Sequence, residues 1–83
     1  MTEDQIITEI ERQIRKLVPD LAESITADTR FEEIGMDSLT RVDLLAAAEG
    51  SFDIEVPDEA VAGLVHVRDL ADLVMSMQPA AAA

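Results

Sequence analysis

The sequence predicts an all-α protein: a small four-helix bundle with three main helices, one short helix, and a long loop between the first and second helices. Three segments carry apolar residues at steps of three and four, the spacing of one face of an α-helix. The chain has only two aromatic residues, Phe31 and Phe52, so its core is mainly aliphatic, a composition that favours helices over a sheet sandwich. Its 83 residues suffice for one domain, expected over residues 1–78 and followed by a disordered tail over 79–83.

The first predicted helix has a clear start, a clear stripe and a clear end. Thr2 and Gln5 match a capping box, in which each side chain accepts a bond from the other residue's backbone N–H. Acidic residues at the start and basic residues at the end suit the helix dipole, and Pro19 stops the helix. Its apolar stripe consists of Ile6, Ile7, Ile10, Ile14, Leu17 and Val18.

Residues 20–36 show no sustained period, so we expect a long loop. Leu21, Ile25 and Phe31 are the side chains expected to anchor this loop to the core. The loop is longer than most connections in a compact domain, which favours a functional role. Gly35 is expected to adopt a backbone conformation that other residues resist.

A second helix is expected to begin at Asp37 or Ser38 and to end near Gly50. The segment that follows, residues 52–56, alternates apolar and polar residues like a strand. No other segment offers it a partner strand, so we interpret it as an extended loop. The expected apolar face of the helix contains Leu39, Val42, Leu45 and Ala46, with Leu44 and Ala48 beside it.

The rest of the chain predicts a short helix and a last main helix. Pro57 is suited to open a short helical turn that runs to Ala62 and ends at Gly63. The last helix is expected from Val67 to Met77, before Pro79. It should bury Val67, Leu70, Ala71 and Val74.

Charge and composition exclude several function classes. The formal net charge of −12 opposes binding to nucleic acid and to anionic membranes. The chain has no cysteine, which excludes disulfides, thiolate zinc sites and cysteine nucleophiles. We expect no metal site, because residues 53–59 lack the alternating ligands and central glycine of an EF-hand loop. With an acidic start and no long apolar run, the chain is expected to be soluble and cytoplasmic.

Ser38 is the candidate functional residue. It alone among the four serines lies at the predicted start of an amphipathic helix, after Gly35 and Asp37. The first-turn N–H groups of a helix have no helical partners, and the dipole adds positive charge, so an anion such as a phosphate ester is favoured there. Asp37 is suited to cap the helix. The plainer interpretation is that Asp37 and Ser38 only cap this helix.

Four segments together resemble the acyl carrier protein family: residues 31–39, which carry the sequence FEEIGMDSL, residues 42–44, residues 52–59 and residues 67–74. This resemblance covers nearly the whole chain. It implies that a phosphopantetheinyl transferase attaches 4'-phosphopantetheine from coenzyme A to Ser38, and that Asp37 and Leu39 adjoin the arm. The arm's thiol would hold acyl groups as thioesters, so the chain would be a carrier acted on by enzymes and not itself an enzyme. A freestanding, monomeric carrier is expected.

The resemblance also implies a docking surface around the second helix. The net charge is −5 over residues 20–37 and −5 over residues 49–59, on either side of this helix. We interpret these stretches as a rim that meets a basic patch on an acyl-loading enzyme, a ketosynthase or an acyltransferase; the plainer interpretation is ordinary solvated loops. Met36 and Leu39 are either contact or core residues. The expected docking residues are Met36, Arg41, Val42, Asp43, Glu49, Asp58 and Glu59.

Three departures from fatty-acid carriers favour polyketide or other specialised biosynthesis. Arg41 is basic on the second helix, Gly50 stands where an acid is common, and residues 46–48 are three slim alanines. The alanines also suggest that the core opens to shelter part of an acyl chain. His66 is expected to have a structural or incidental role and no catalytic one. The alternatives are a discrete aminoacyl (peptidyl) carrier and an acidic helical adaptor that never carries an arm.

Overall fold

Three α-helices and two short 3-10 helices follow one another in the computed structural model, which describes residues 2–77. Their order is α1 (Glu3–Leu17), η1 (Phe31–Ile34), α2 (Ser38–Phe52), η2 (Asp58–Gly63) and α3 (Val67–Met77). The predicted all-α class is confirmed, and its short helix is the 3-10 helix η2. No strand occurs within residues 2–77, where the only bridge joins Arg30 and His66. The predicted tail lies outside the described residues.

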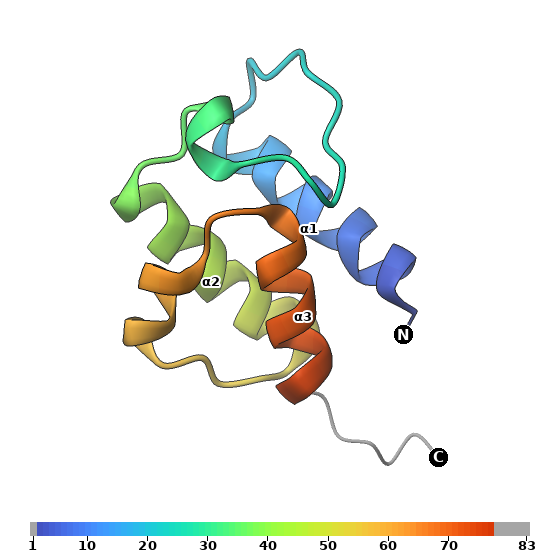
Figure 1. The fold of residues 1–83 in the computed structure, drawn as a ribbon, viewed down its shortest axis with the longest axis vertical. Helices are drawn as coiled ribbons and strands as arrows, with labels where there is room; N and C mark the ends of the chain where they lie inside the picture. Colours follow the sequence, from blue (N-terminus) through green and yellow to red (C-terminus); the bar gives the residue numbers. More distant parts are fainter. Residues whose placement is uncertain (1, 78–83) are drawn as a thin grey trace.

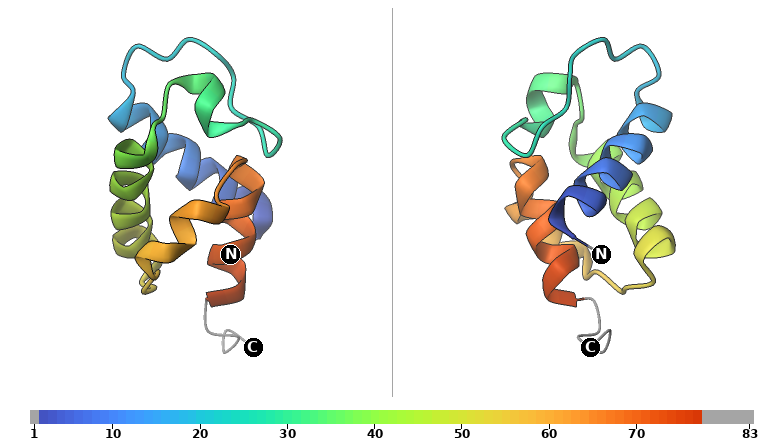
Figure 2. Two further views of the ribbon diagram at one scale, coloured as in Figure 1. Left: turned by 60° about the vertical axis from the view of Figure 1, so that its left-hand side comes forward. Right: turned by 90° about the vertical axis from the view of Figure 1, so that its right-hand side faces the viewer.

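α1 is the common packing partner of α2 and α3. α1 contacts both α2 and α3, while η2 contacts α2 (Figure 1). The turned views show α1 on one side of the α2–α3 pair and η2 on the other (Figure 2). The connection between α1 and η1 arches over one end of the molecule, and the amino-terminal end of α2 lies near the same end (Figure 1).

α1 starts and ends as the sequence predicts. The Thr2 hydroxyl accepts a bond from the Gln5 N–H at 3.2 Å, and the Gln5 side-chain oxygen accepts one from the Thr2 N–H at 2.9 Å. This reciprocal pair satisfies two N–H groups that would otherwise lack partners. Ile6, Ile10 and Ile14 are almost completely buried, so the core side of the predicted stripe is confirmed.

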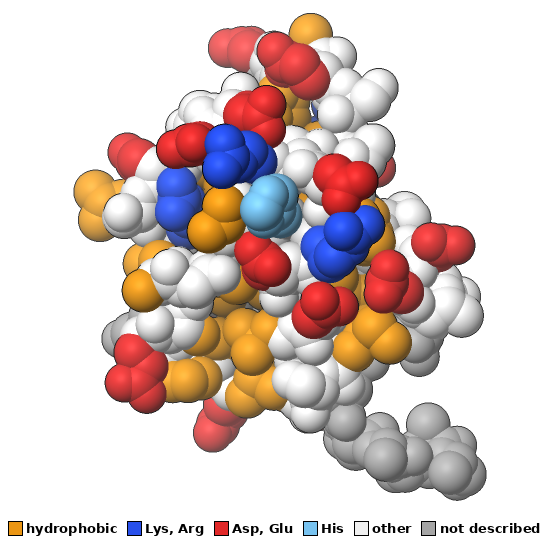
Figure 3. All heavy atoms as spheres, in the orientation of Figure 1, with side chains coloured by type: hydrophobic (Ala, Val, Ile, Leu, Met, Phe, Trp, Pro, Cys, Tyr) orange, Lys and Arg blue, Asp and Glu red, His pale blue; other side chains and the backbone are white. Residues whose placement is uncertain are grey.

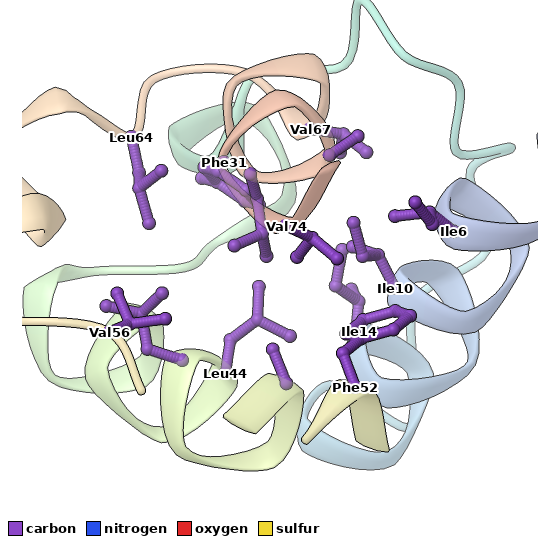
Figure 4. Packing of buried hydrophobic residues seen from close by; sticks show 14 of the residues in the cluster. Ile6, Ile10, Ile14, Phe31, Leu44, Phe52, Val56, Leu64, Val67 and Val74 are labelled. Atoms are coloured by element: carbon purple, nitrogen blue, oxygen red, sulfur yellow. The ribbon is translucent and has the colours of Figure 1, made fainter. Parts of the chain in front are cut away.

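The core lies where the three helices and the loop meet. Leu44 of α2 points toward Val74 of α3, and Ile10 and Ile14 of α1 lie beside this pair (Figure 4). Phe31 of η1 enters the same cluster and is fully buried. Burial of such a side chain contributes about 1.5–3 kcal/mol, so the core explains why a chain with so few aromatics folds.

The end of α2 differs from its prediction. The helix continues through Gly50 to Phe52, and Asp53 then ends it in the left-handed conformation at φ 55°. The Asp53 N–H bonds to the Glu49 carbonyl. Phe52 is buried, so its packing offsets the weak helix propensity of Gly50, which is about 1 kcal/mol below that of Ala.

The predicted core face of α2 is also wrong in part. Leu39 is 77% exposed, Val42 is 42% exposed, and Ala46 is exposed as well. The helix is apolar on most sides, so spacing alone left its orientation open. Of the three alanines only Ala48 is fully buried, and sheltering of an acyl chain stays a prediction. The side that packs into the core carries Leu44, Leu45, Ala48 and Phe52.

The long loop contains order that the sequence did not indicate. Ile25 and Phe31 are buried as expected, and Leu21 packs against the core. Beyond these anchors, the backbone of residues 27–31 bonds to that of residues 65–68. The Phe31 N–H donates to the Val65 carbonyl at 3.0 Å, and the Arg68 N–H donates to the Ala27 carbonyl at 2.8 Å. These bonds fasten the loop to the start of α3.

The last two elements match their predictions closely. Pro57 precedes η2, and α3 spans Val67 to Met77 with the four predicted core residues buried. Asp69 caps α3: its carboxylate accepts bonds from the His66 N–H at 2.8 Å and the Val65 N–H at 3.0 Å. Among the described residues, no helix is both long enough and apolar enough to cross a bilayer.

Candidate functional site

The site is built around a tight turn between η1 and α2. Gly35 has a φ of 79°, a conformation that L-residues with side chains resist, so its predicted conformation is confirmed. It ends η1, a short helix that the sequence did not predict. The Met36 N–H then bonds back to the Phe31 carbonyl at 3.1 Å. Asp37 is the N-cap of α2 and Ser38 is its first residue. We call residues 35–38 the attachment turn.

Asp37 fixes the start of α2 through Thr40. One Asp37 carboxylate oxygen accepts a bond from the Thr40 N–H and another from the Thr40 hydroxyl, both at 2.9 Å. These two bonds, with a smaller contribution from the charge of Arg41, hold the pKa of Asp37 below its ordinary value. The carboxylate is therefore ionised at neutral pH and stabilises the amino-terminal end of the helix.

Ser38 lies exposed on the first turn of this helix. Its hydroxyl is thus open to an enzyme that approaches from solvent. A phosphate ester formed on it would sit beside first-turn N–H groups and the positive end of the dipole. The residues present therefore fit a phosphate-linked group on Ser38. A group held there would supply its own chemistry, while the chain would supply position and recognition.

The outward face of α2 continues from Ser38 as an apolar strip with charge beside it. Leu39 and Val42 are exposed and lie one turn apart, and Asp43 is exposed next to Val42. The structure thus decides the open question about Leu39, which is a surface residue. Exposed apolar side chains beside a candidate site are suited to burial against a partner.

Met36 does not share this surface. Its side chain is only 1% exposed and belongs to the core cluster. The prediction that Met36 is a docking contact is therefore wrong for this conformation. The turn at Gly35 directs the chain inward at Met36 before Asp37 brings it back to the surface, and spacing alone does not reveal such a reversal.

Arg41 and Glu49 also use their charges within the chain. The Arg41 Nε donates to the Met36 carbonyl at 3.2 Å, and its Nη1 donates to the Leu64 carbonyl at 3.5 Å. The Glu49 carboxylate accepts a bond from the Val56 N–H at 3.0 Å and so holds the segment after α2. Both side chains are half-buried, so neither is a simple surface charge.

The remaining predicted docking residues lie around η2. The Glu59 side chain is exposed, and the Asp58 backbone begins η2. Both acidic stretches therefore adjoin α2, one at each end. His66 lies elsewhere, with its Nδ1 3.4 Å from the Asp69 carboxylate, an arrangement that suits the expected structural role.

Two residues of the site escaped the sequence analysis. Thr40 had a usable signal, because it stands three residues after an N-cap aspartate, the distance such a cap bridges. Leu64 had none, because its carbonyl meets Arg41 only through the tertiary fold.

Comparison with known proteins identifies a family over most of the chain. Residues 5–74 match the family model described as "Phosphopantetheine attachment site". The chain is 39% identical over 74 residues to an acyl carrier protein from Akkermansia muciniphila, covering 83% of this chain and 92% of that one. It is 35% identical over 81 residues to the mitochondrial acyl carrier protein of Saccharomyces cerevisiae, covering 92% of this chain and 65% of that one.

Solved structures show the same fold. An acyl carrier protein from Thermotoga maritima superposes with a TM-score of 0.80 at 24% identity, covering 90% of this chain and 88% of that chain. The 3-oxo-butyl carrier protein of the actinorhodin polyketide synthase from Streptomyces coelicolor superposes with a TM-score of 0.67 at 27% identity. That match covers 93% of this chain and 90% of that chain.

Proposed function

The chain belongs to the acyl carrier protein family, whose phosphopantetheine-binding domain carries a covalent 4'-phosphopantetheine, and from this premise we propose that Ser38 holds the arm. The observation that carries the proposal is the position of Ser38: exposed, first in α2, and directly after the N-cap Asp37. The arm's terminal thiol supplies the thioester chemistry. The protein is thus a carrier domain and not a catalyst.

Each residue of the attachment turn has a part in this proposal. Gly35 permits the sharp turn, and Asp37 fixes the helix start so that the Ser38 hydroxyl is presented to a transferase. Leu39 and Val42 provide apolar surface beside the arm, and Asp43 provides charge. Partner enzymes with a basic patch, such as a ketosynthase, an acyltransferase or an acyl-loading enzyme, suit this surface.

We further propose an acyl cargo from polyketide or other specialised biosynthesis. Arg41, Gly50 and the alanines of α2 support this type, as does the similarity to the actinorhodin carrier at 27% identity. Fatty-acid synthesis is the second candidate, because the Akkermansia relative, at 39% identity, is described simply as an acyl carrier protein, with no mention of a polyketide synthase. The relatives are acyl carriers, which favours an acyl cargo over an aminoacyl one. The monomeric state and the cytoplasmic location stay predictions.

The mass of the intact protein tests the attachment. After incubation with coenzyme A and a promiscuous phosphopantetheinyl transferase, the wild type should gain one phosphopantetheinyl group, and Ser38→Ala should gain none. Ser76→Ala is the matched control, because Ser76 lies on α3 and bonds only its own helix, to the Leu73 carbonyl. A wild-type chain that folds but never gains mass would instead support the adaptor alternative.

A further inference from the structure

The attachment turn lies against the segment that joins η2 to α3. The backbone of residues 27–31 bonds to residues 65–68, so η1 begins where α3 begins. The Met36 N–H then bonds to the Phe31 carbonyl, and the Phe31 N–H bonds to the Val65 carbonyl. This backbone route from the attachment turn to Val65 therefore passes through a single residue, Phe31.

Arg41 provides a second and more direct connection. Side chains on a helix lean toward its amino-terminal end, so Arg41 reaches back past the first turn of α2. There its Nε bonds to the Met36 carbonyl and its Nη1 to the Leu64 carbonyl. Both of those residues bury their side chains almost completely, at 1% and 3% exposure. One guanidinium thus joins the attachment turn to the residue that follows η2.

We infer that Arg41 is a positioning residue that latches the attachment turn to Leu64, and that its charge does not serve partner docking. The role in presenting Ser38 rests on the proposed function, whereas the latch itself does not. A guanidinium suits this task, because its fork of N–H donors can bond two carbonyls at once and its charge strengthens both bonds.

Two other arginines near the start of α3, Arg30 and Arg68, lie beside acidic side chains instead of backbone carbonyls. On the face that contains His66, Lys and Arg side chains alternate with Asp and Glu (Figure 3). Arg68 pairs with Asp28 at 2.8 Å, and Arg30 lies 3.6 Å from Glu32. The side chains in both pairs are at least half-exposed, whereas Arg41 is half-buried and bonds to backbone. Arg41 therefore differs from them in both burial and partner.

The latch couples two parts of the molecule. Leu64 is also bonded through its N–H to the Val61 carbonyl of η2. Loss of the latch should therefore loosen the attachment turn and the end of η2 together. A turn that is ordered for only part of the time binds a transferase more weakly in proportion to that fraction, so KM should rise while kcat stays near the wild-type value.

Amide hydrogen exchange on the protein without its arm tests the latch independently of Ser38. The Met36 and Leu64 N–H groups bond to the Phe31 and Val61 carbonyls, so they exchange only when the attachment turn or the end of η2 opens. In Arg41→Gln and in Arg41→Lys they should exchange about two- to tenfold faster, because losing the Arg41 hydrogen bonds makes this opening easier by about that factor. The Ile10 amide in α1 serves as the internal reference for global stability. Arg68→Gln is the matched control, because it removes a neighbouring arginine without touching either carbonyl. Unchanged exchange at Met36 and Leu64 in both Arg41 variants would overturn the inference.

Transferase kinetics then separate a latch from a docking charge. A latch predicts a raised KM in both Arg41→Lys and Arg41→Gln, with a ratio to wild type that added salt leaves unchanged. A docking charge predicts that Lys, which keeps the charge, restores the wild-type KM and that salt removes the difference; this result would overturn the inference. If the wild type gained no mass, the proposed function would fail while the exchange result would still decide the latch.

Discussion

The two ends of α2 are stabilised by bonds of different reach. At the amino-terminal end, the Asp37 carboxylate accepts both of its bonds from Thr40, three residues away. Ser38 and Leu39 at this end are both exposed, and Thr40 and Arg41 are half-buried. Apart from the Arg41 bond to Leu64, this end is therefore organised by neighbours in the sequence, and it remains accessible.

The carboxyl-terminal end of α2 is bonded across the bundle to α1. The Gln13 side-chain amide donates to the Ser51 hydroxyl at 2.8 Å and to the Glu9 carboxylate at 2.7 Å. Ser51 donates to the same carboxylate at 2.9 Å, and Arg12 holds it by two further bonds. Phe52 is buried beside this network. A helix that must present one end to other proteins is thus anchored through its opposite end.

Matched truncations at the two ends should separate folding from function most strongly. Phe52→Ala removes a buried ring and should lower the free energy of unfolding by about 3–5 kcal/mol. Leu39→Ala removes an exposed side chain and should change it by less than about 0.5 kcal/mol, while slowing acyl transfer from a partner. Urea denaturation and a transfer assay measure the two effects. Equal losses of stability would contradict the distinction between the ends.

The Glu9 network predicts an acid-sensitive anchor. Bonds from Arg12, Gln13 and Ser51 lower the pKa of Glu9 from 4.5 to about 2. A carboxylate whose pKa is lower in the folded state stabilises the fold above its unfolded pKa, and this contribution is lost as the pH falls from about 4.5 toward about 2.

Glu9→Gln should therefore reduce stability at pH 7 by about 1–2 kcal/mol and flatten the acid side of the pH–stability curve. Glu55→Gln, at an exposed position outside α1, is the control and should change the stability at pH 7 by less than about 0.5 kcal/mol. A Glu9→Gln curve that is parallel to the wild-type curve from pH 5 to pH 2 would show that the network does not bind the charged form.

Charge reversals near the accessible end should have the smallest effect on stability and a clear effect on association. Asp43→Lys should leave stability within about 0.5 kcal/mol of wild type, yet slow association with a basic partner in a way that salt abolishes. Glu49→Lys should also weaken transfer, but with a loss of stability, because Glu49 bonds the Val56 N–H. Asp72→Lys on α3 is the distant control. Association rates that ignore Asp43→Lys would rule out a charge-steered rim.

The elements that were predictable from the sequence are those with strong local signals. α1 has a capping box and a one-sided stripe, and α3 has its spacing followed by Pro79, so their bounds and core faces were correct. Within the attachment turn, the conformation of Gly35 and the start of α2 at Asp37 and Ser38 were also predicted correctly, whereas the burial of Met36 was not. Local chemistry decides the features that were predicted correctly.

The features that the sequence did not predict are burial and bonding partners that only the tertiary fold decides. α2 is apolar on most sides, so only contact with α1 and η2 selects its core face. Met36 is buried by the reversal at Gly35. Glu49 bonds to Val56, beyond the end of α2, and Arg41 bonds to Leu64, 23 residues along the chain. No spacing rule within α2 reveals such partners.

Locating the residue that carries the arm tests the proposed function most directly. Tandem mass spectrometry of peptides from the transferase-treated wild-type protein would locate the added phosphopantetheinyl group on a single residue. We predict that it lies on Ser38, in the peptide that contains Asp37 and Leu39, and on no other serine. Modification of Ser24, Ser51 or Ser76, or a folded protein with no modified peptide, would contradict the assignment of the attachment turn.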